Sequence, residues 1–225
     1  MTTALRVALL GAESTGKTTL AQALQARLAD EFGLQVVVVP EVLRQWCDAR
    51  GRTPRRDEQA GIAEEQQRRI DAAAASADLV LCDTTPLMTA VYSQLVFGDH
   101  ALDDLALAAQ STIALTLLTA VDLPWIADGL QRDGPQVRGP VDAGVRAMLR
   151  AAGGDWTIVQ GLGEARVACA IDALRPLLRR RAAGAAPGLF KRLAASRSGP
   201  PVPRWRCPHC DLPACEHALR GAARP

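Results

Sequence analysis

The sequence contains few aromatic residues, almost no lysine and no long apolar run. Aromatic side chains make up 4% of the 225 residues, and Lys17 and Lys191 are the only lysines among 26 basic residues. The longest apolar run, residues 113–121, is about half of the ~18 residues that a membrane-spanning helix requires. The early apolar run at residues 7–10 is interrupted by charged residues too soon for a secretory signal. We therefore expect a cytoplasmic chain that does not contact a membrane.

The rest of the composition is that of a folded globular protein. Hydrophobic residues make up 48% and charged residues 22% of the chain, and the net charge is +2. These values exclude disorder throughout, a collagen helix and a coiled coil as the main architecture. The length allows one α/β domain of about 150 residues plus an appendage. Cys47, Cys82 and Cys169 are scattered through apolar surroundings, where we expect small, reduced, buried side chains.

Charge and proline are unevenly distributed along the chain. Residues 175–225 hold eleven Lys or Arg against two acidic residues, and seven of the fourteen prolines lie at or after Pro187. This shift predicts a folded domain at residues 1–182, a basic proline-rich linker at 183–203 and a tail at 204–225. The basic region is expected either to be simply solvated or to contact nucleic acid or an acidic partner.

Short apolar runs alternate with amphipathic stretches along the first 180 residues. Strands are expected at residues 6–10, 35–39, 79–82, 113–119 and 156–160. Helices are expected after residue 16 and at 42–50, 57–76, 86–97, 102–110, 141–152 and 164–181, with a mobile loop at 129–140. Strands that alternate with helices pair in parallel through right-handed crossovers, so the predicted fold is α/β, a three-layer sandwich around a parallel sheet of about five strands.

Residues 11–18, Gly-Ala-Glu-Ser-Thr-Gly-Lys-Thr, match the phosphate-binding loop pattern G-x-x-x-x-G-K-[ST] between a predicted strand and a predicted helix. Gly11 and Gly16 allow the backbone N–H groups to turn toward phosphate oxygens. Lys17 is expected to reach the β- and γ-phosphates of ATP, and the Thr18 hydroxyl to coordinate Mg²⁺. The candidate nucleotide-binding residues are Gly11, Glu13, Ser14, Thr15, Gly16, Lys17, Thr18 and Thr19. The fold is thus expected to be that of a P-loop NTPase.

Two acidic residues follow predicted strands. Asp83 ends the third strand and is a candidate Mg²⁺ ligand, held directly or through water, or an ordinary strand-terminating residue. Glu41 follows the second strand and could accept the proton of a substrate hydroxyl, or could simply occupy the start of a helix. The choice of catalytic base between these two carboxylates stays open.

The loop at residues 129–140 carries Arg132 and Arg138 among glycine and proline. A mobile loop with arginine can close over a transferred phosphoryl group, where it adds positive charge and excludes water. Solvated surface arginines are the alternative. Trp46, Tyr92 and Trp125 are candidates either for stacking on an aromatic substrate ring or for core packing.

Four stretches together resemble the NadR-type nicotinamide riboside kinase domain over about residues 5–180. They are residues 9–20, Pro40-Glu41, Asp83-Thr84-Thr85 with Tyr92-Ser93, and residues 122–130. The resemblance implies transfer of a phosphoryl group from ATP, with Mg²⁺, to the 5′-hydroxyl of nicotinamide riboside. It assigns residues 11–18 to ATP, Asp83 to the metal or the ribose, and the loop with Arg132 and Arg138 to the lid.

Bifunctional members of that family carry a nucleotidyltransferase domain before the kinase, whereas here the P-loop begins near residue 10, so adenylyl transfer is not expected. Other relatives are AAA-type ATP-binding proteins without an assigned substrate. An ATP-responsive binding module whose basic tail contacts nucleic acid or a protein partner is the alternative function. An ATPase or remodelling machine is a third.

The end of the chain holds a group of metal-ligand residues with the spacing C-x₂-C-x₄-C-x-H. The expected ligands of a structural Zn²⁺ are Cys207, Cys210, Cys215 and His217. His209 could replace His217. The tail has little apolar content, so a metal would supply its folding energy. A redox Cys-x-x-Cys pair would require a strand-to-helix context, which the preceding prolines do not provide.

Overall fold

The computed structural model describes residues 4–126 and 134–184, and the chain divides into two compact units at residues 1–180 and 181–225. The first unit is built on one sheet of five strands. They are β1 (Leu5–Leu10), β2 (Val36–Val39), β3 (Leu79–Asp83), β4 (Leu115–Thr119) and β5 (Trp156–Val159). No helix in the described ranges is long and apolar enough to cross a membrane.

Helical segments connect the strands. They are α1 (Lys17–Phe32), α2 (Val42–Arg50), the short 3₁₀ turn η1 (Arg56–Glu58), α3 (Gln59–Ala74), α4 (Pro86–Phe97), α5 (Asp103–Gln110), the 3₁₀ turn η2 (Pro135–Val137), α6 (Arg138–Ala152) and α7 (Gly163–Gly184). Apart from their boundaries, these segments and the five strands follow the order that the sequence predicts.

All strand pairs are parallel, and the strand order is β2-β3-β1-β4-β5. The chain therefore leaves β1 at the centre of the sheet, goes to one edge for β2 and β3, and later crosses to the other side for β4 and β5. A ligand site is expected where the direction reverses, outside the carboxyl ends of β1, β3 and β4. The predicted P-loop starts at this point.

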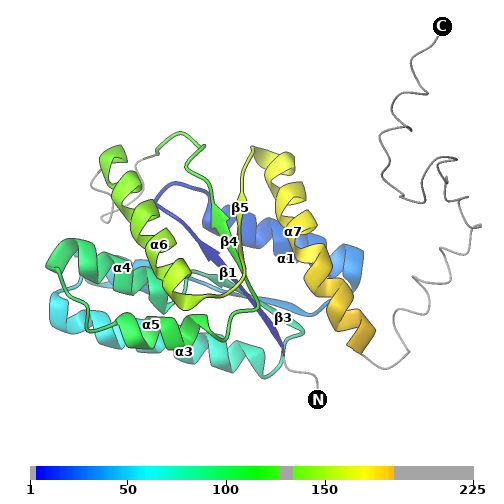
Figure 1. The fold of residues 1–225 in the computed structure, drawn as a ribbon, viewed down its shortest axis with the longest axis horizontal. Helices are drawn as coiled ribbons and strands as arrows, with labels where there is room; N and C mark the ends of the chain where they lie inside the picture. The colour runs from blue at the N-terminus through cyan, green and yellow to red at the C-terminus, as the bar shows by residue number, and fades with distance from the viewer. Residues whose placement is uncertain (1–3, 127–133, 185–225) are drawn as a thin grey trace, which may run out of the picture. The chain divides into compact units, whose positions relative to one another are not determined.

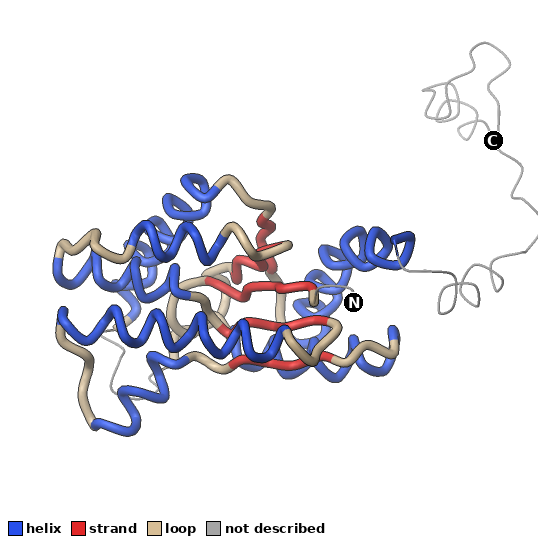
Figure 2. The backbone as a smooth tube through the Cα atoms, turned by 90° about the horizontal axis from the view of Figure 1, so that it is seen from below, coloured by secondary structure: helices blue, strands red, loops and turns tan. Residues whose placement is uncertain are grey.

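Helices cover both faces of the sheet. Val7 and Leu9 of β1 pack with α1 and α7, whereas Ala8 and Leu10 pack with the helices of the other face. Figure 1 shows α1 and α7 together on one side of the sheet and α3, α4, α5 and α6 on the other. Figure 2 shows the strands lying side by side between the helices. The three-layer α/β sandwich is thus confirmed.

One boundary differs in a way that affects the site. The sequence predicts a loop to residue 140 and a helix from 141, but α6 begins at Arg138. Pro140 is compatible with the first helical turn because its missing N–H has no intrahelical partner there. Val141 and Val145 are buried against the α4 side of the core, so packing extends the helix back through Gly139.

Candidate functional site

The P-loop follows β1 and packs against Thr119, the last residue of β4. Gly11 has a φ of +147° and Gly16 a φ of +75°, conformations that favour glycine. A side chain at Gly11 would collide with the Thr119 hydroxyl and lie 2.9 Å from the Thr119 carbonyl oxygen. A Cβ at Gly16 would lie 3.0 Å from Leu123. Close packing therefore adds to the backbone requirement for glycine at both positions.

Two buried threonines fix the loop to β4. The hydroxyl oxygens of Thr15 and Thr119 lie 2.7 Å apart. Thr15 Oγ1 is also 2.7 Å from the Ala12 carbonyl oxygen, and Thr119 Oγ1 is 3.1 Å from the Leu10 carbonyl oxygen. These contacts hold the backbone of residues 10–15 in one shape before any ligand arrives.

The Lys17 ammonium is held inside the loop. Its Nζ donates to the carbonyl oxygens of Gly11 and Ala12, both at 2.9 Å. Burial lowers the pKa of Lys17 from its ordinary value, and the negative charges of Glu41 and Asp83 oppose that shift. A partly buried ammonium interacts more strongly with an incoming phosphate than one in bulk water.

Thr18 and Asp83 form a polar corner beside Lys17. The Thr18 hydroxyl donates to Asp83 Oδ2 at 2.6 Å. Asp83 is 2% exposed, and its Oδ1 has no hydrogen-bond partner among the described residues. A buried carboxylate oxygen without a donor suits a hard cation or its bound water, and Mg²⁺ prefers such oxygen ligands. Thr18 and Asp83, the two Mg²⁺ ligands that the sequence predicts, therefore fit that ion in their chemistry and position.

The residue after Asp83 is strained. Thr84 has a φ of +72°, which is rare for a β-branched residue and costs about 1–3 kcal/mol. Its N–H donates to the Leu9 carbonyl oxygen at 3.2 Å, which ties the end of β3 to β1. This strain occurs where the chain must turn directly after the carboxylate.

Glu41 lies at the same edge of the sheet, directly before α2. It occupies the N-cap position, but its side chain does not cap the helix. Its carboxylate instead faces Arg44, with an Nε–Oε2 distance of 3.8 Å, and the side chain is 11% exposed. Its charge also acts on Lys17, so Glu41 lies near the P-loop and not only at a helix start. The structure thus brings Glu41, Asp83 and Lys17 to one place.

The two predicted lid arginines have different outcomes. Arg132 lies outside the described residues. The sequence predicts Arg138 in a loop, but the structure places it in the first turn of α6. Its side chain is buried, with 7% of the residue exposed. One nitrogen, Nη1, donates to the Leu123 carbonyl oxygen at 2.9 Å, while Nε and Nη2 are buried without a hydrogen-bond partner in the described ranges. These N–H groups are suited to an anionic ligand.

A pocket of about 860 Å³ opens between the P-loop and the helices that follow β2 and β3. Its lining combines Glu13 of the P-loop with apolar side chains, among them Leu43, Tyr92 and Phe97. Gln59 also lines it, is 5% exposed, and its Oε1 has no partner within the described part of the chain. Of the three aromatic candidates, Tyr92 lines this pocket, whereas Trp46 packs between Arg50 and Arg52.

Sequence reasoning missed Gln59 and a second residue, Arg166. Arg166 lies near the start of α7 and is 4% exposed. Its position shares a helix face with the buried residues Ala170 and Leu174, four and eight positions later. An arginine on an apolar helical stripe was the available signal, because such a charge needs buried partners.

The remaining metal and cysteine predictions have separate outcomes. The predicted zinc ligands Cys207, Cys210, Cys215 and His217, with the alternative His209, all lie outside the described residues. Within the described ranges no three or more His, Cys, Asp or Glu side chains come together in a way that could hold a metal ion. Cys47, Cys82 and Cys169 are free thiols, and Cys169 is only partly buried. Burial raises the pKa of Cys82 to about 12, so it is an unreactive core residue.

Solved structures with this fold include two of NadR protein. The structure in complex with NAD and AMP-PNP matches with a TM-score of 0.61 and 21% identity, over 77% of this chain and 49% of that chain. The structure in complex with NR matches with a TM-score of 0.60 and 22% identity, over 77% and 50%. This chain thus spans about half the length of the NadR chains.

Thymidylate kinase from Ehrlichia chaffeensis also matches, with a TM-score of 0.55 and 14% identity, over 78% of this chain and all of that one. At these identities the likeness shows the fold alone. No curated protein matches the sequence. Residues 6–166, however, match the AAA_28 family (AAA domain), and since this match covers more than half of its length, the chain belongs to that family of P-loop domains.

Proposed function

We propose that this chain is an ATP-dependent small-molecule kinase that transfers the γ-phosphoryl group of ATP to the 5′-hydroxyl of nicotinamide riboside or a similar nucleoside. The observation that carries the proposal is the hydrogen bond of Thr18, in the P-loop, to the buried Asp83, together with a pocket large enough for a nucleoside that Glu13 of the same loop lines. Pockets for small ligands typically span about 300–1,000 Å³. An ATPase without an acceptor substrate would need no such pocket beside its P-loop.

Each polar side chain has a distinct role in this proposal. The amides of the P-loop and the Lys17 ammonium bind the β- and γ-phosphates. Thr18 and Asp83 would hold Mg²⁺, which would supply charge neutralisation at the phosphates. Asp83 already accepts the Thr18 hydroxyl, so Glu41 is the better base for the acceptor hydroxyl. Nε and Nη2 of Arg138, which have no partner in the described part of the chain, bind the transferred phosphoryl group, where charge spreads over three oxygens.

Two of the three arginines that line the pocket, Arg52 and Arg56, are already paired with carboxylates, which favours a nucleoside over a nucleoside monophosphate. Arg52 is paired with Glu58 through two contacts of 2.7 Å, and Arg56 with Asp99 at 2.9 and 3.1 Å. These two arginines are therefore already neutralised by carboxylates. Gln59 Oε1 is left to accept a hydrogen bond, so the acceptor should present an N–H or O–H group to it.

The test is phosphoryl transfer to a panel of acceptors. The purified chain is incubated with MgATP and nicotinamide riboside, other nucleosides and thymidine monophosphate, and products are identified by mass spectrometry. We expect a nucleoside monophosphate from at least one nucleoside and little product from thymidine monophosphate. Absence of any phosphorylated product, with MgATP bound, would refute the kinase proposal.

Gln59 provides a sharper version of the test. Replacing it by leucine removes the unpaired acceptor, so the KM for the nucleoside should rise by about tenfold while the affinity for MgATP stays unchanged. Gln67→Leu is the matched control, because Gln67 lies on the same helix but bonds to Asp71 at 3.0 Å. An equal effect of both variants would show that Gln59 does not contact the acceptor.

A further inference from the structure

The guanidinium of Arg166 joins three separate segments of the chain. Nη1 donates to Asp122 Oδ1 at 2.8 Å and to the Gly161 carbonyl oxygen at 2.7 Å. Nη2 donates to the carbonyl oxygens of Thr15 at 3.0 Å and Ala120 at 3.2 Å. One buried side chain thus holds the P-loop, the chain after β4 and the turn after β5.

These segments all follow the carboxyl ends of strands. β1, β4 and β5 are parallel, so the turns after them meet at one edge of the sheet. Figure 1 shows the beginning of α7 beside this edge, next to β4 and β5. The acceptor pocket is lined by Glu13, by the helices that follow β2 and β3 and by the start of α6, and neither Arg166 nor any of its four partners lines it. Arg166 therefore acts on the phosphate side of the site.

Asp122 completes the cluster. Its Oδ2 accepts the Gly161 N–H at 2.7 Å, while Oδ1 pairs with Arg166. Burial opposes ionisation of Asp122, but the bonds from Arg166 and the Gly161 N–H outweigh it and hold the pKa of this carboxyl below its ordinary value. The two terminal nitrogens of the buried arginine are thus paired with an ionised carboxylate and with three carbonyl dipoles, while Nε is buried without a partner in the described ranges.

The contact with Thr15 has a direct geometric effect on the P-loop. The Thr15 carbonyl and the Gly16 N–H belong to one planar trans peptide unit and point in opposite directions. An arginine that pins the carbonyl oxygen on the outer side of the loop therefore fixes the direction of the Gly16 N–H on the other side. Gly16 has a left-handed φ of +75°, a conformation from which glycine escapes easily unless its neighbours restrain it.

We propose that Arg166 is a positioning residue for phosphate binding, which orients the Gly16 amide through the Thr15 carbonyl and keeps the P-loop in register with the segments after β4 and β5. This inference rests on the proposed binding of MgATP. The planar guanidinium of Arg166 donates to four acceptors at once, which the ammonium group of a lysine could not do.

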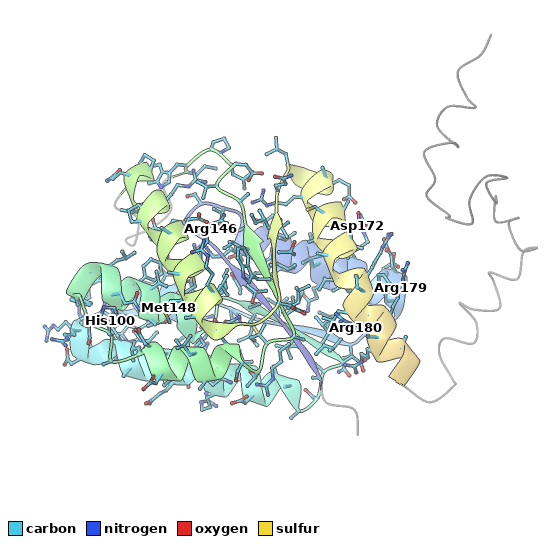
Figure 3. All side chains as sticks on the ribbon, in the orientation of Figure 1. His100, Arg146, Met148, Asp172, Arg179 and Arg180 are labelled. Atoms are coloured by element: carbon cyan, nitrogen blue, oxygen red, sulfur yellow. The ribbon has the colours of Figure 1, made fainter. Side chains whose placement is uncertain are left out.

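The experiment compares Arg166→Met and Arg166→Lys with the control Arg146→Met. Arg146, labelled on α6 in Figure 3, pairs with Asp142 at 2.6 Å and lies over the ring of Trp156, the first residue of β5. Dissociation constants for MgATP and for magnesium tripolyphosphate are measured by calorimetry, well below the melting temperature of each variant. A purely structural role would lower the melting temperature but leave these constants unchanged.

We expect Arg166→Met to weaken both ligands by about tenfold or more, Arg166→Lys by about threefold, and Arg146→Met to have no effect. A wild-type chain that binds no MgATP would refute the proposed function itself. Normal binding by Arg166→Met, or a loss for MgATP without a loss for tripolyphosphate, would overturn the inference about Arg166. If the methionine variant does not fold, the lysine variant decides, and unchanged affinity in that variant overturns the inference.

Discussion

The Thr18 hydroxyl donates a 2.6 Å hydrogen bond to the Asp83 carboxylate, which links the first turn of α1 to the end of β3. These residues are 65 positions apart, and the pairing of β1 with β3 brings them together. The oxygen atoms that would hold Mg²⁺ are therefore in place without the ligand. Little reorganisation should be needed when MgATP binds.

Substitutions of Asp83 and Glu41 should have different kinetic effects, because we propose Asp83 as a Mg²⁺ ligand and Glu41 as the general base. Asp83→Asn keeps a hydrogen-bond acceptor for Thr18 but loses its charge, so the Mg²⁺ concentration required for half-maximal activity should rise. Glu41→Gln should lower kcat by about 10²–10⁴ and leave MgATP affinity unchanged, as loss of a general base predicts. Mg²⁺ titrations and steady-state kinetics on both variants distinguish the roles. Weakened MgATP binding in Glu41→Gln without a fall in kcat would reverse the assignment.

Lys17 should be essential for the nucleotide. Lys17→Met removes the ammonium that the carbonyl groups of Gly11 and Ala12 hold in position, and we expect turnover to fall by about 10²–10³ together with weaker MgATP binding. Calorimetry and turnover measurements check this. Lys191, the other lysine, provides the control in Lys191→Met, which should leave both quantities unchanged. Equal heats of MgATP binding in wild type and Lys17→Met would contradict the entire nucleotide assignment.

Arg138 should matter for turnover more than for substrate binding. Nε and Nη2, which have no hydrogen-bond partner among the residues described, are predicted to contact the phosphoryl group in the transition state, so Arg138→Met should lower kcat by about 10² with a smaller change in KM for ATP. The matched control is Arg146→Met, on the same helix but paired with Asp142. A variant that only melts at a lower temperature, with normal kcat, would assign Arg138 to the stability of α6.

Glu58, which pairs with Arg52 in the wall of the pocket, should make the free energy of unfolding depend on pH. Hydrogen bonds from the Arg52 side chain, and then from the Arg55 N–H, lower the pKa of Glu58 from 4.5 to about 2. The folded state therefore holds its proton less tightly than the unfolded state, and the stabilisation present above pH 4.5 is lost as the pH falls toward about 2. Urea midpoints of wild type and Glu58→Gln should differ at neutral pH and converge in acid.

The tail should bind zinc. Metal analysis of the purified chain should find one zinc per chain, lost in Cys207→Ser and in His217→Ala but kept in His209→Ala. Residues 1–182 alone should retain phosphoryl transfer, because the predicted catalytic residues all precede the tail. Zinc content that survives Cys207→Ser would show that the spacing has been misinterpreted.

The fold and the centre of the site could be predicted because their signals are local. Apolar runs at β1 and β3 gave the buried strands, and the glycines and lysine at residues 11–17 define a loop whose shape follows from short-range geometry. Asp83 and Glu41 could be placed together because parallel strands end at one edge. These inferences require only the order of elements along the chain.

The features that could not be predicted depend on contacts between distant segments. Gly139 and Pro140 are typical of a loop, and only the burial of Val141 and Val145 against the α4 side of the core makes them part of α6. Gln59 acquires its significance from a pocket that several helices build together. The partners of Arg166 are separated from it by as many as 151 positions.

The fit between Gly11 and Thr119 also has an evolutionary consequence. No side chain can be added at Gly11 while the threonine hydroxyl occupies that space, and the same hydroxyl lies against Thr15. Positions 11, 15 and 119 should therefore vary as a set among relatives, with a smaller residue at 119 accompanied by a change at 15. The last residue of β4 would then change together with the P-loop during evolution, although it has no role in phosphate binding in the mechanism proposed above.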